Sequence, residues 1–210
     1  MARDISPKCK QCRSEGEKLF LKGDRCYSVK CAIIKRKYPG GIHGPKGYPR
    51  QSEYALQLRE KQKIKRFYGI LEKQLRKYYE AAKKHIGNTE VLLLSSLERR
   101  LDNVIYRAGL SASRQGARQL INHGHILVNN KKVDIPSYQV KTGDSISLRE
   151  NNKLSRQIKE ILADSKTKSE LPKWFTFDKK KTEIKIINLP TPEDLPQEFN
   201  VRLVVEFYSR

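Results

Sequence analysis

The spacing of apolar residues changes near residue 125, and this change limits the folds that the chain can form. Before it, apolar side chains recur every three to four positions, as they do on the buried side of a helix. After it, short apolar runs are separated by polar turns, as in strands. The pattern predicts an α+β fold, in which a helical body precedes two helices packed on a small, mainly antiparallel sheet.

Capping residues and glycines divide the helical part. Ser52 can cap a first helix that Gly69 ends. A second helix follows, with one apolar stripe and an outer face rich in lysine and arginine, and a third is expected over residues 90–108. Ser113 can cap a fourth, short helix that ends at Gly124.

The strands are expected in the second half. Residues 126–128 and 133–135 flank a polar turn, and residues 145–148 alternate as a half-buried strand does. A further helix is expected over residues 154–165. Two more strands are expected near the C-terminus, at residues 184–187 and 201–207.

The formal net charge of +21 indicates a polyanionic partner. Residues 1–90 carry +14 of it, with 23 Lys and Arg against 9 Asp and Glu. Nucleic acid is favoured over a membrane surface, because the cations are spread along the chain and not gathered on one amphipathic helix. No run approaches the ~18 apolar residues of a spanning helix, and no signal peptide is expected.

Four cysteines near the N-terminus predict one structural Zn²⁺ ion. Cys9 and Cys12 are separated by two residues, Cys26 and Cys31 by four, and thirteen residues lie between the pairs. Two close pairs at such a distance are typical of tetrahedral zinc sites, and four protein ligands leave no open position for a substrate. Disulfides or free buried cysteines are the alternatives, and disulfides are unexpected without a secretory signal. The sequence does not decide between zinc and iron.

Residues 98–148 combine features that suit RNA recognition. The outward side of the helix that Ser113 caps is expected to carry Arg114 and Arg118, one turn apart. The free N–H groups at the start of that helix attract phosphate. Lys131 and Lys132 stand at a hairpin tip. Together these predict a small basic surface without a catalytic group, which recognises RNA by backbone and shape.

Three separated segments resemble the bacterial ribosomal protein S4 family, over nearly the whole chain. Within the module the resemblance lies in Arg-Leu-Asp-Asn-Val-Ile-Tyr-Arg at 100–107, in the Ser-Arg and Ala-Arg-Gln-Leu parts of 113–120, and in His-Gly-His-Ile-Leu-Val-Asn at 123–129. Arg-Glu-Lys-Gln-Lys at 59–63 resembles the family's helical domain, and Val-Glu-Phe-Tyr-Ser-Arg at 205–210 its C-terminus. The cysteine pattern is similar to that of zinc-bearing members.

The resemblance implies a structural constituent of the small ribosomal subunit, in the cytoplasm, and not an enzyme. It implies a primary binder of the 5′ domain of small-subunit rRNA that nucleates assembly. It also implies contacts with ribosomal protein S5 and other small-subunit proteins, and an influence on translational accuracy near the mRNA entrance, where Lys46 and Arg50 can meet mRNA. The resemblance also implies that residues 98–148 have the fold of this family's S4 domain.

Basic residues supply most of the expected RNA contacts. The candidate RNA-binding residues are Arg3, Lys8, Arg13, Lys22, Lys30, Lys35, Arg36, His43, Lys46, Arg50, Arg59, Lys61, Lys63, Lys65, Arg66, Arg76, Arg99, Arg100, Arg107, Ser113, Arg114, Arg118, His123, Lys131 and Lys132.

Four parts are expected along the chain. They are a zinc-binding arm with a basic loop at 1–50, a helical rRNA-binding domain at 51–92, the S4 RNA-binding domain at 93–163, and a linker with C-terminal strands at 164–210.

The sequence departs from the family pattern at a few positions. Gly116 stands where the family often has Gln. Glycine costs about 1 kcal/mol of helix propensity relative to Ala, and a possible RNA contact is lost. Asn130 replaces a turn glycine, which asparagine can do because it tolerates positive φ. Residues 164–196 match weakly, so the resemblance does not predict their contacts.

Three other functions fit the sequence less well. An RNA-modifying enzyme such as a pseudouridine synthase needs a catalytic domain, and only about 60 residues follow residue 150. A zinc-finger DNA regulator needs a recognition helix after the second cysteine pair, where the chain runs into Gly/Pro loop. A purely protein-binding zinc protein does not explain the net charge.

Overall fold

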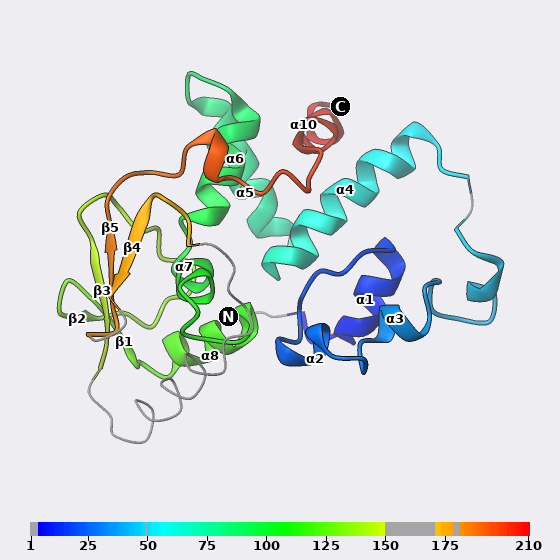
Figure 1. Ribbon diagram of the computed structural model, residues 1–210. Coiled ribbons are helices and arrows are strands. Elements are labelled where there is room, and N and C mark those ends of the chain that lie inside the picture. The colour runs from blue at the N-terminus through cyan, green and yellow to red at the C-terminus, as the bar shows by residue number, and fades with distance from the viewer. Residues whose placement is uncertain (1–3, 49, 150–170, 179–180) are drawn as a thin grey trace. The chain divides into compact units, whose positions relative to one another are not determined.

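The computed structural model describes residues 4–48, 50–149, 171–178 and 181–210, and it forms two compact units (Figure 1). Unit 1 contains residues 1–93 and 196–210, and unit 2 contains residues 94–195. The helix α6 (Thr89–Glu98) spans the boundary between them. The helix expected over residues 154–165 lies outside the described residues.

Unit 1 is helical in its described part. Its elements are α1 (Lys8–Glu15), α2 (Asp24–Tyr27), α3 (Ala32–Lys35), the 3₁₀ turn η1 (Gly44–Lys46), α4 (Glu53–Tyr68), α5 (Glu72–Lys84), the first half of α6 and α10 (Val201–Ser209). The predicted cap of α4 is confirmed, since the Ser52 hydroxyl accepts a hydrogen bond from the Ala55 N–H at 3.3 Å. The predicted end is confirmed as well: Gly69 adopts a φ of 61°, which glycine tolerates without strain.

The segment predicted as a strand at residues 201–207 is instead the helix α10, which packs on α4. Its β-branched valines suggested a strand. However, Val201 and Val204 are both buried, and a spacing of three places them on one helical face. The chain before α10 adds to the same core, because the Phe199 ring meets Phe67 edge to face with centroids 4.9 Å apart. The C-terminal residues therefore complete the N-terminal core.

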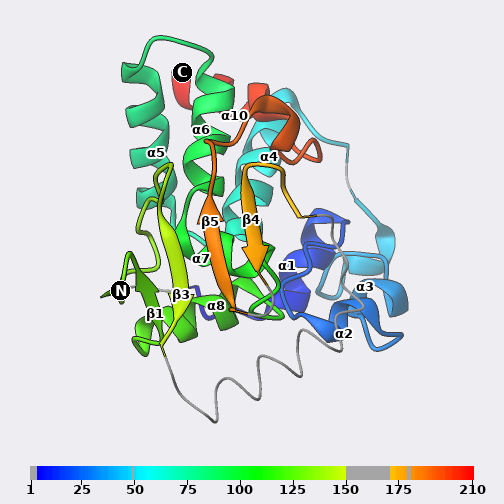
Figure 2. The ribbon, with the colours of Figure 1, turned by 60° about the vertical axis from the view of Figure 1, so that its left-hand side comes forward.

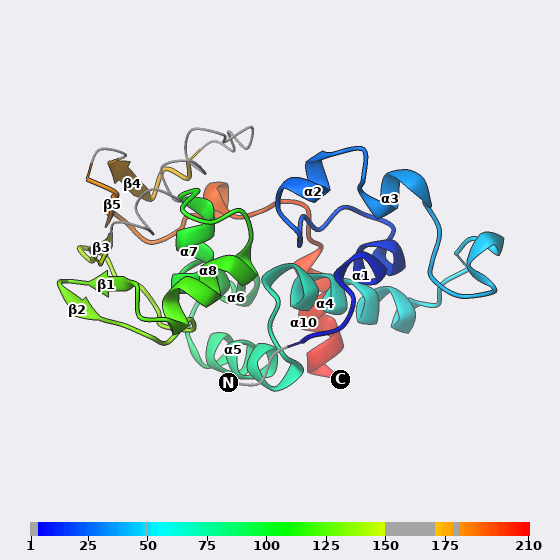
Figure 3. The same cartoon turned by 90° about the horizontal axis from the view of Figure 1, so that it is seen from below.

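Unit 2 packs two helices against one side of an antiparallel sheet (Figures 2 and 3). Its elements are the second half of α6, α7 (Leu101–Arg107), α8 (Arg114–Asn122), β1 (Ile126–Val128), β2 (Lys131–Lys132), β3 (Ser145–Leu148), β4 (Phe175–Asp178), β5 (Glu183–Ile186) and the 3₁₀ turn η2 (Pro192–Asp194). The strand order is β2-β1-β3-β5-β4, and every neighbouring pair is antiparallel. The prediction of a mixed helical and antiparallel fold is confirmed.

The core of unit 2 lies between the sheet and the helices α7 and α8. Ile105 and Ile121 from the helices and Ile126, Ile146 and Ile184 from the strands are at most 1% exposed. Burying each of these side chains stabilises the fold by about 1.5–3 kcal/mol before entropy is subtracted. This apolar layer fixes the positions of the polar side chains described below.

Residues 90–108 form two helices and not the single one predicted. Between α6 and α7 the backbone pairs with a distant segment: the Val140 N–H donates to Arg99 O at 3.0 Å, and the Leu101 N–H to Tyr138 O at 2.9 Å. Local periodicity carries no sign of such pairing, so the break was missed.

The strand predicted at residues 133–135 is also absent, because β2 ends at Lys132. The Val133 N–H still donates to Ile126 O at 3.2 Å, but Ile135 O then accepts from the Tyr138 N–H in a turn. Strand β4 was not predicted at all. Phe175 and Phe177 alternate with Thr176 and Asp178 as in a short strand, and this signal was missed.

Candidate nucleic-acid interface

The start of α8 was expected to present cations outward, and it does not. Ser113 caps the helix as predicted, accepting from the Gly116 N–H at 3.1 Å. Arg114, however, is 7% exposed. Its Nε donates to Asn103 Oδ1 at 2.9 Å, and its guanidinium lies 4.4 Å from the centre of the Tyr106 ring. The expectation fails because α7 supplies a polar partner that the local sequence does not show.

Arg118, one turn further on, is also turned inward. Its Nε donates to Asp102 Oδ2 at 2.6 Å, and its side chain is 12% exposed. The same carboxylate accepts from Arg100, Nε to Oδ1 at 3.1 Å and Nη2 to Oδ2 at 2.8 Å. Two guanidinium groups thus share one buried carboxylate, and the expectation of an outward Arg118 is wrong.

A second buried carboxylate organises the other side of α7. Glu98 is 0% exposed and accepts from Arg107, Nε to Oε2 at 3.1 Å and Nη2 to Oε1 at 2.8 Å. Asn103 Nδ2 donates to Glu98 Oε2 at 2.7 Å, which links Glu98 to Arg114. We call these seven side chains the arginine network. Its members are Glu98, Arg100, Asp102, Asn103, Arg107, Arg114 and Arg118.

The arginine network holds α7 against α8, and its acidic and amide members were missed by sequence reasoning. Paired Arg–carboxylate bonds are short and directional, so they fix the two helices in one register. These members are Glu98, Asp102 and Asn103. On the single helix predicted over residues 90–108, these three residues lie beside the apolar stripe and not within it, so periodicity gave no sign that they are buried. Buried polar groups require partners.

The hairpin between β1 and β2 does present cations. Asn129 and Asn130 adopt φ angles of 51° and 63°, so the turn forms without the family's glycine, as predicted. Lys131 and Lys132 follow it and are exposed. The Lys132 chain lies close over Gly124, because a Cβ added there would be 2.2 Å from Lys132 Cε. A Cβ there would require the Lys132 side chain to move, and the φ of 71° at Gly124 would strain any other residue.

His123, at the end of α8, is exposed and directly precedes Gly124. Its backbone is joined to Gly124, over which the Lys132 side chain lies. We call His123, Lys131 and Lys132 the hairpin patch. Among the predicted RNA-binding residues that the structure describes in unit 2, these three are exposed, and the others are part-buried or buried.

A buried carboxylate braces the base of this hairpin. Asp144 is 7% exposed and accepts from the Asn129 side chain at 2.8 Å and from the Lys141 N–H at 2.7 Å. Asn129 Oδ1 in turn accepts from the Ser145 N–H at 2.9 Å. The turn is thereby held rigidly, and the patch cations start from a fixed backbone.

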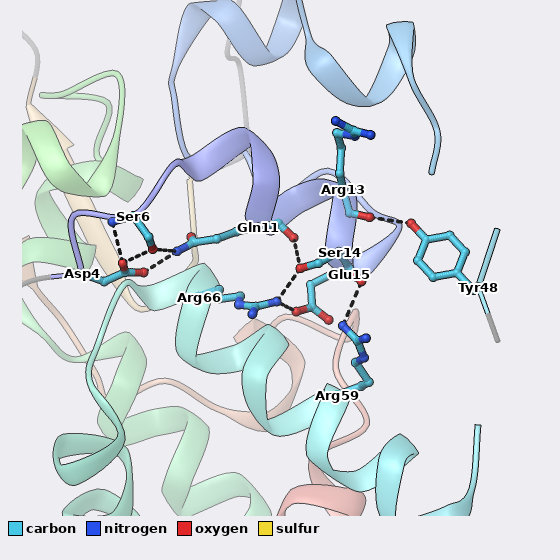
Figure 4. A network of polar contacts seen from close by, with 9 residues as sticks. All are labelled: Asp4, Ser6, Gln11, Arg13, Ser14, Glu15, Tyr48, Arg59 and Arg66. Carbon is cyan, nitrogen blue, oxygen red and sulfur yellow. Dashed lines mark hydrogen bonds and ion pairs between the residues drawn. The ribbon is translucent and has the colours of Figure 1, made fainter. Parts of the chain in front are cut away.

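In unit 1, Arg13 organises the basic loop. Its Nε donates to Tyr38 O at 2.8 Å and its Nη2 to Pro39 O at 2.9 Å. The Tyr48 hydroxyl donates to Arg13 O at 2.6 Å, as Figure 4 shows. Arg13 is therefore a positioning residue for residues 36–48.

Arg59 and Arg66 join α4 to α1 (Figure 4). Arg59 Nη1 donates to Ser14 O at 3.0 Å, and Arg66 Nη1 donates to Ser14 Oγ at 2.7 Å and pairs with Glu15. Burial lowers the pKa of the Arg66 guanidinium. Both arginines bind protein atoms in the described structure, although they were predicted to bind RNA.

Two lysines of α4 are buried and hold the C-terminal segment. Lys61 Nζ donates to Glu72 Oε1 at 2.7 Å, and Lys63 Nζ donates to Glu198 O at 2.9 Å. The Tyr208 hydroxyl donates to the same Glu72 oxygen at 2.7 Å. Burial opposes ionisation of Glu72, but the bonds from Lys61 and Tyr208 outweigh it and lower the pKa of Glu72. Burial and this bond together raise the pKa of Tyr208.

The predicted RNA-binding residues thus fall into distinct groups. Arg3 lies outside the described residues. Those that are exposed are Lys22, Lys30, Lys35, Arg36, His43, Lys46, Arg50, Arg76, His123, Lys131 and Lys132. Those that are part-buried are Arg13, Arg59, Lys65, Arg66, Arg99, Arg107, Ser113 and Arg118, and those that are buried are Lys8, Lys61, Lys63, Arg100 and Arg114.

The four cysteines line one cavity between α1, α2 and α3, but the predicted zinc site is not formed. Among residues 4–48, 50–149, 171–178 and 181–210, no group of three or more His, Cys, Asp or Glu side chains is placed to hold a metal ion. A zinc site requires donor atoms at about 2.0–2.3 Å around one point. Spacing along the chain does not guarantee that geometry, so the predictions of a zinc-stapled arm and a Zn²⁺ cofactor are wrong.

The cysteines instead contribute to packing. All four are free thiols, and Cys12, Cys26 and Cys31 are buried. Burial raises the pKa of the Cys12 and Cys26 thiols, so both stay protonated. Cys26 Sγ accepts from the Lys22 N–H at 3.3 Å. Protonated buried thiols behave as small apolar side chains.

None of the described helices combines the length and the apolar character needed to cross a bilayer.

Comparison with known proteins gives matches over the whole chain. A family model described as ribosomal protein S4/S9 N-terminal domain matches residues 3–98, and one described as S4 domain matches residues 99–146. The small ribosomal subunit proteins uS4 of Halothermothrix orenii, Clostridioides difficile and Thermus thermophilus are 51%, 50% and 49% identical to the chain over 210 residues. Each match covers 100% of both sequences.

Proposed function

Because this chain belongs to the ribosomal protein uS4 family, whose members are structural constituents of the small ribosomal subunit in the cytoplasm, we propose that it binds the 5′ domain of small-subunit rRNA directly. Binding occurs early and nucleates assembly at a multi-helix junction. The observation that carries the proposal is the hairpin patch, which places exposed cations on a rigid turn of an S4-type module. Such a surface reads RNA by phosphate position and shape.

Within the module we assign two roles to the basic residues. The hairpin patch contacts RNA, whereas the arginine network positions α7 and α8. Lys131→Ala with Lys132→Ala should therefore weaken RNA binding and leave the unfolding transition unchanged. Arg114→Ala with Arg118→Ala should lower stability first, because it leaves Asn103 and Asp102 buried without these partners. If the lysine pair binds RNA normally, the assignment of the patch is wrong.

The loop of unit 1 supplies the proposed contact with mRNA. Lys46 and Arg50 are exposed, and Arg13 and Tyr48 hold the loop that carries Lys46. Preorganised cations cost less entropy when they bind a flexible strand. Contact with ribosomal protein S5, and an influence on translational accuracy, are further parts of the proposal and rest on family membership.

A filter-binding titration tests the central proposal. The whole chain is titrated against a 5′-domain rRNA fragment at several salt concentrations, with duplex DNA and an unrelated structured RNA as competitors. We expect tight rRNA binding that survives both competitors and weakens steeply with salt. Equal affinity for all three nucleic acids, or a flat salt dependence, would overturn it.

A further inference from the structure

We propose that the outward side of α5 is an additional RNA-contact surface, which lies against the phosphate backbone of structured RNA. We call it the α5 face, and it consists of Lys73, Lys77, Lys83 and Lys84. The inference rests on the proposed function, because it assigns a further part of the same protein to RNA. None of these four lysines was among the predicted binding residues.

The four side chains form a continuous surface. All are exposed. An α-helix turns by about 100° and rises about 1.5 Å per residue, so Lys73, Lys77 and Lys84 lie within about 40° of one another around the axis and span about 16 Å. Lys83 lies about 80–120° around the axis from this line, in nearly the same direction as the exposed Arg76 and two turns beyond it.

The opposite side of α5 is already occupied. Leu75, Tyr79 and Ala82 are buried, and the Tyr79 ring stacks on Tyr208 of α10 with centroids 4.9 Å apart. Figure 3 shows α5 beside α10 within unit 1. The helix is thus held by its apolar side, and the lysines are not needed for its packing.

The lysines of the α5 face form no ion pairs in the described structure. Among the described residues, no carboxylate forms an ion pair with any of its four lysines, and the exposed Glu80 pairs with Arg76 at 3.0 Å. The lysines of α4 differ, since Lys61, Lys63 and Lys65 each reach a carboxylate. Glu80 lies on the same side of the helix, three residues after Lys77 and four before Lys84, so it offsets one of the five positive charges of Lys73, Arg76, Lys77, Lys83 and Lys84. The remaining excess of positive charge raises the local potential and favours a polyanion.

The chemistry of this surface favours RNA over other anionic partners. Lysine is depleted in protein–protein interfaces, whose centres are apolar or aromatic, and the α5 face has no such centre. A membrane-bound helix would insert its apolar side, but that side of α5 is covered by α10. Lysine ammonium groups on flexible stems suit the spaced charges of a phosphate backbone.

The test compares two variants of the whole chain that lose the same charge. One replaces Lys73, Lys77, Lys83 and Lys84 by Gln, and the other replaces Lys141, Lys173, Lys181 and Lys185, which are exposed in unit 2. Both are titrated with the 5′-domain rRNA fragment at several salt concentrations. Circular dichroism and thermal unfolding verify that both fold, as expected because Gln has nearly the helix propensity of Lys.

We expect the α5 variant to lose about 0.7–0.9 in the slope of log K against log salt for each lysine, or roughly 3 in all, with at least a tenfold loss of affinity near physiological salt. The unit 2 variant should keep most of the slope. If the two variants behave alike while the unaltered chain binds specifically, the α5 inference is overturned and the proposed function stands. If the unaltered chain shows no preference for the rRNA fragment, both are overturned.

Discussion

At the scale of single residues, buried carboxylates decide what the arginines of the module can do. Glu98 is 0% exposed and binds Arg107 and Asn103. Glu98→Ala should destabilise unit 2 by about 3–5 kcal/mol, since it leaves a guanidinium without its buried partner. Urea unfolding measures the change. Arg202→Ala is the control: its pair with Glu206 is exposed and should be worth less than about 1 kcal/mol. If both variants lose the same free energy of unfolding, the buried pairs of the arginine network contribute no more stability than an exposed ion pair.

Gly116 is the residue whose role the sequence suggested least. It was expected to weaken its helix and to remove a possible RNA contact, but a Cβ there would lie 2.4 Å from Ser111 Oγ. That hydroxyl donates to Ser113 O at 3.1 Å, so moving it aside costs about 1 kcal/mol of hydrogen bonding. Gly116→Ala should therefore be nearly neutral alone, and about 1 kcal/mol stabilising in a Ser111→Ala background. A double-mutant cycle by chemical denaturation measures this coupling, and additive effects would contradict it.

At the scale of elements, the sequence predicted what local chemistry controls. The caps at Ser52 and Ser113 and the turn at Asn129 were found because each acts within a few residues. The break between α6 and α7 and the helix α10 were missed, because the partners that define them lie far away in the sequence. The same distinction between local and distant partners applies to the residues of the candidate site. Exposed lysines were predictable, whereas the inward arginines depend on partners from another helix.

The attachment of α10 should depend on pH through Glu72. Because its pKa is lowered in the folded chain, Glu72 stabilises unit 1 above its unfolded pKa of about 4.5, and this contribution is lost as the pH falls through the folded value. Tyr208→Phe removes one bond that lowers the pKa. The variant should therefore lose less stability than the unaltered chain between about pH 5 and pH 3. Thermal unfolding across this range measures it, and parallel curves would exclude the coupling.

At the scale of the whole molecule, one unit is built from both ends of the chain and encloses the sequence of the other. Each unit has its own buried side chains, Val204 in unit 1 and Ile184 in unit 2, both 0% exposed. Val204→Asp places a charge in the contact between α10 and α4, and Ile184→Asp places one in the core beneath the sheet. If the cores are energetically separate, hydrogen exchange should accelerate in α4 and α10 for the first variant and in β1 and β3 for the second. Acceleration throughout the chain in both variants would instead show a single cooperative core, and the N-terminal helices would then depend on the S4-type module for their stability.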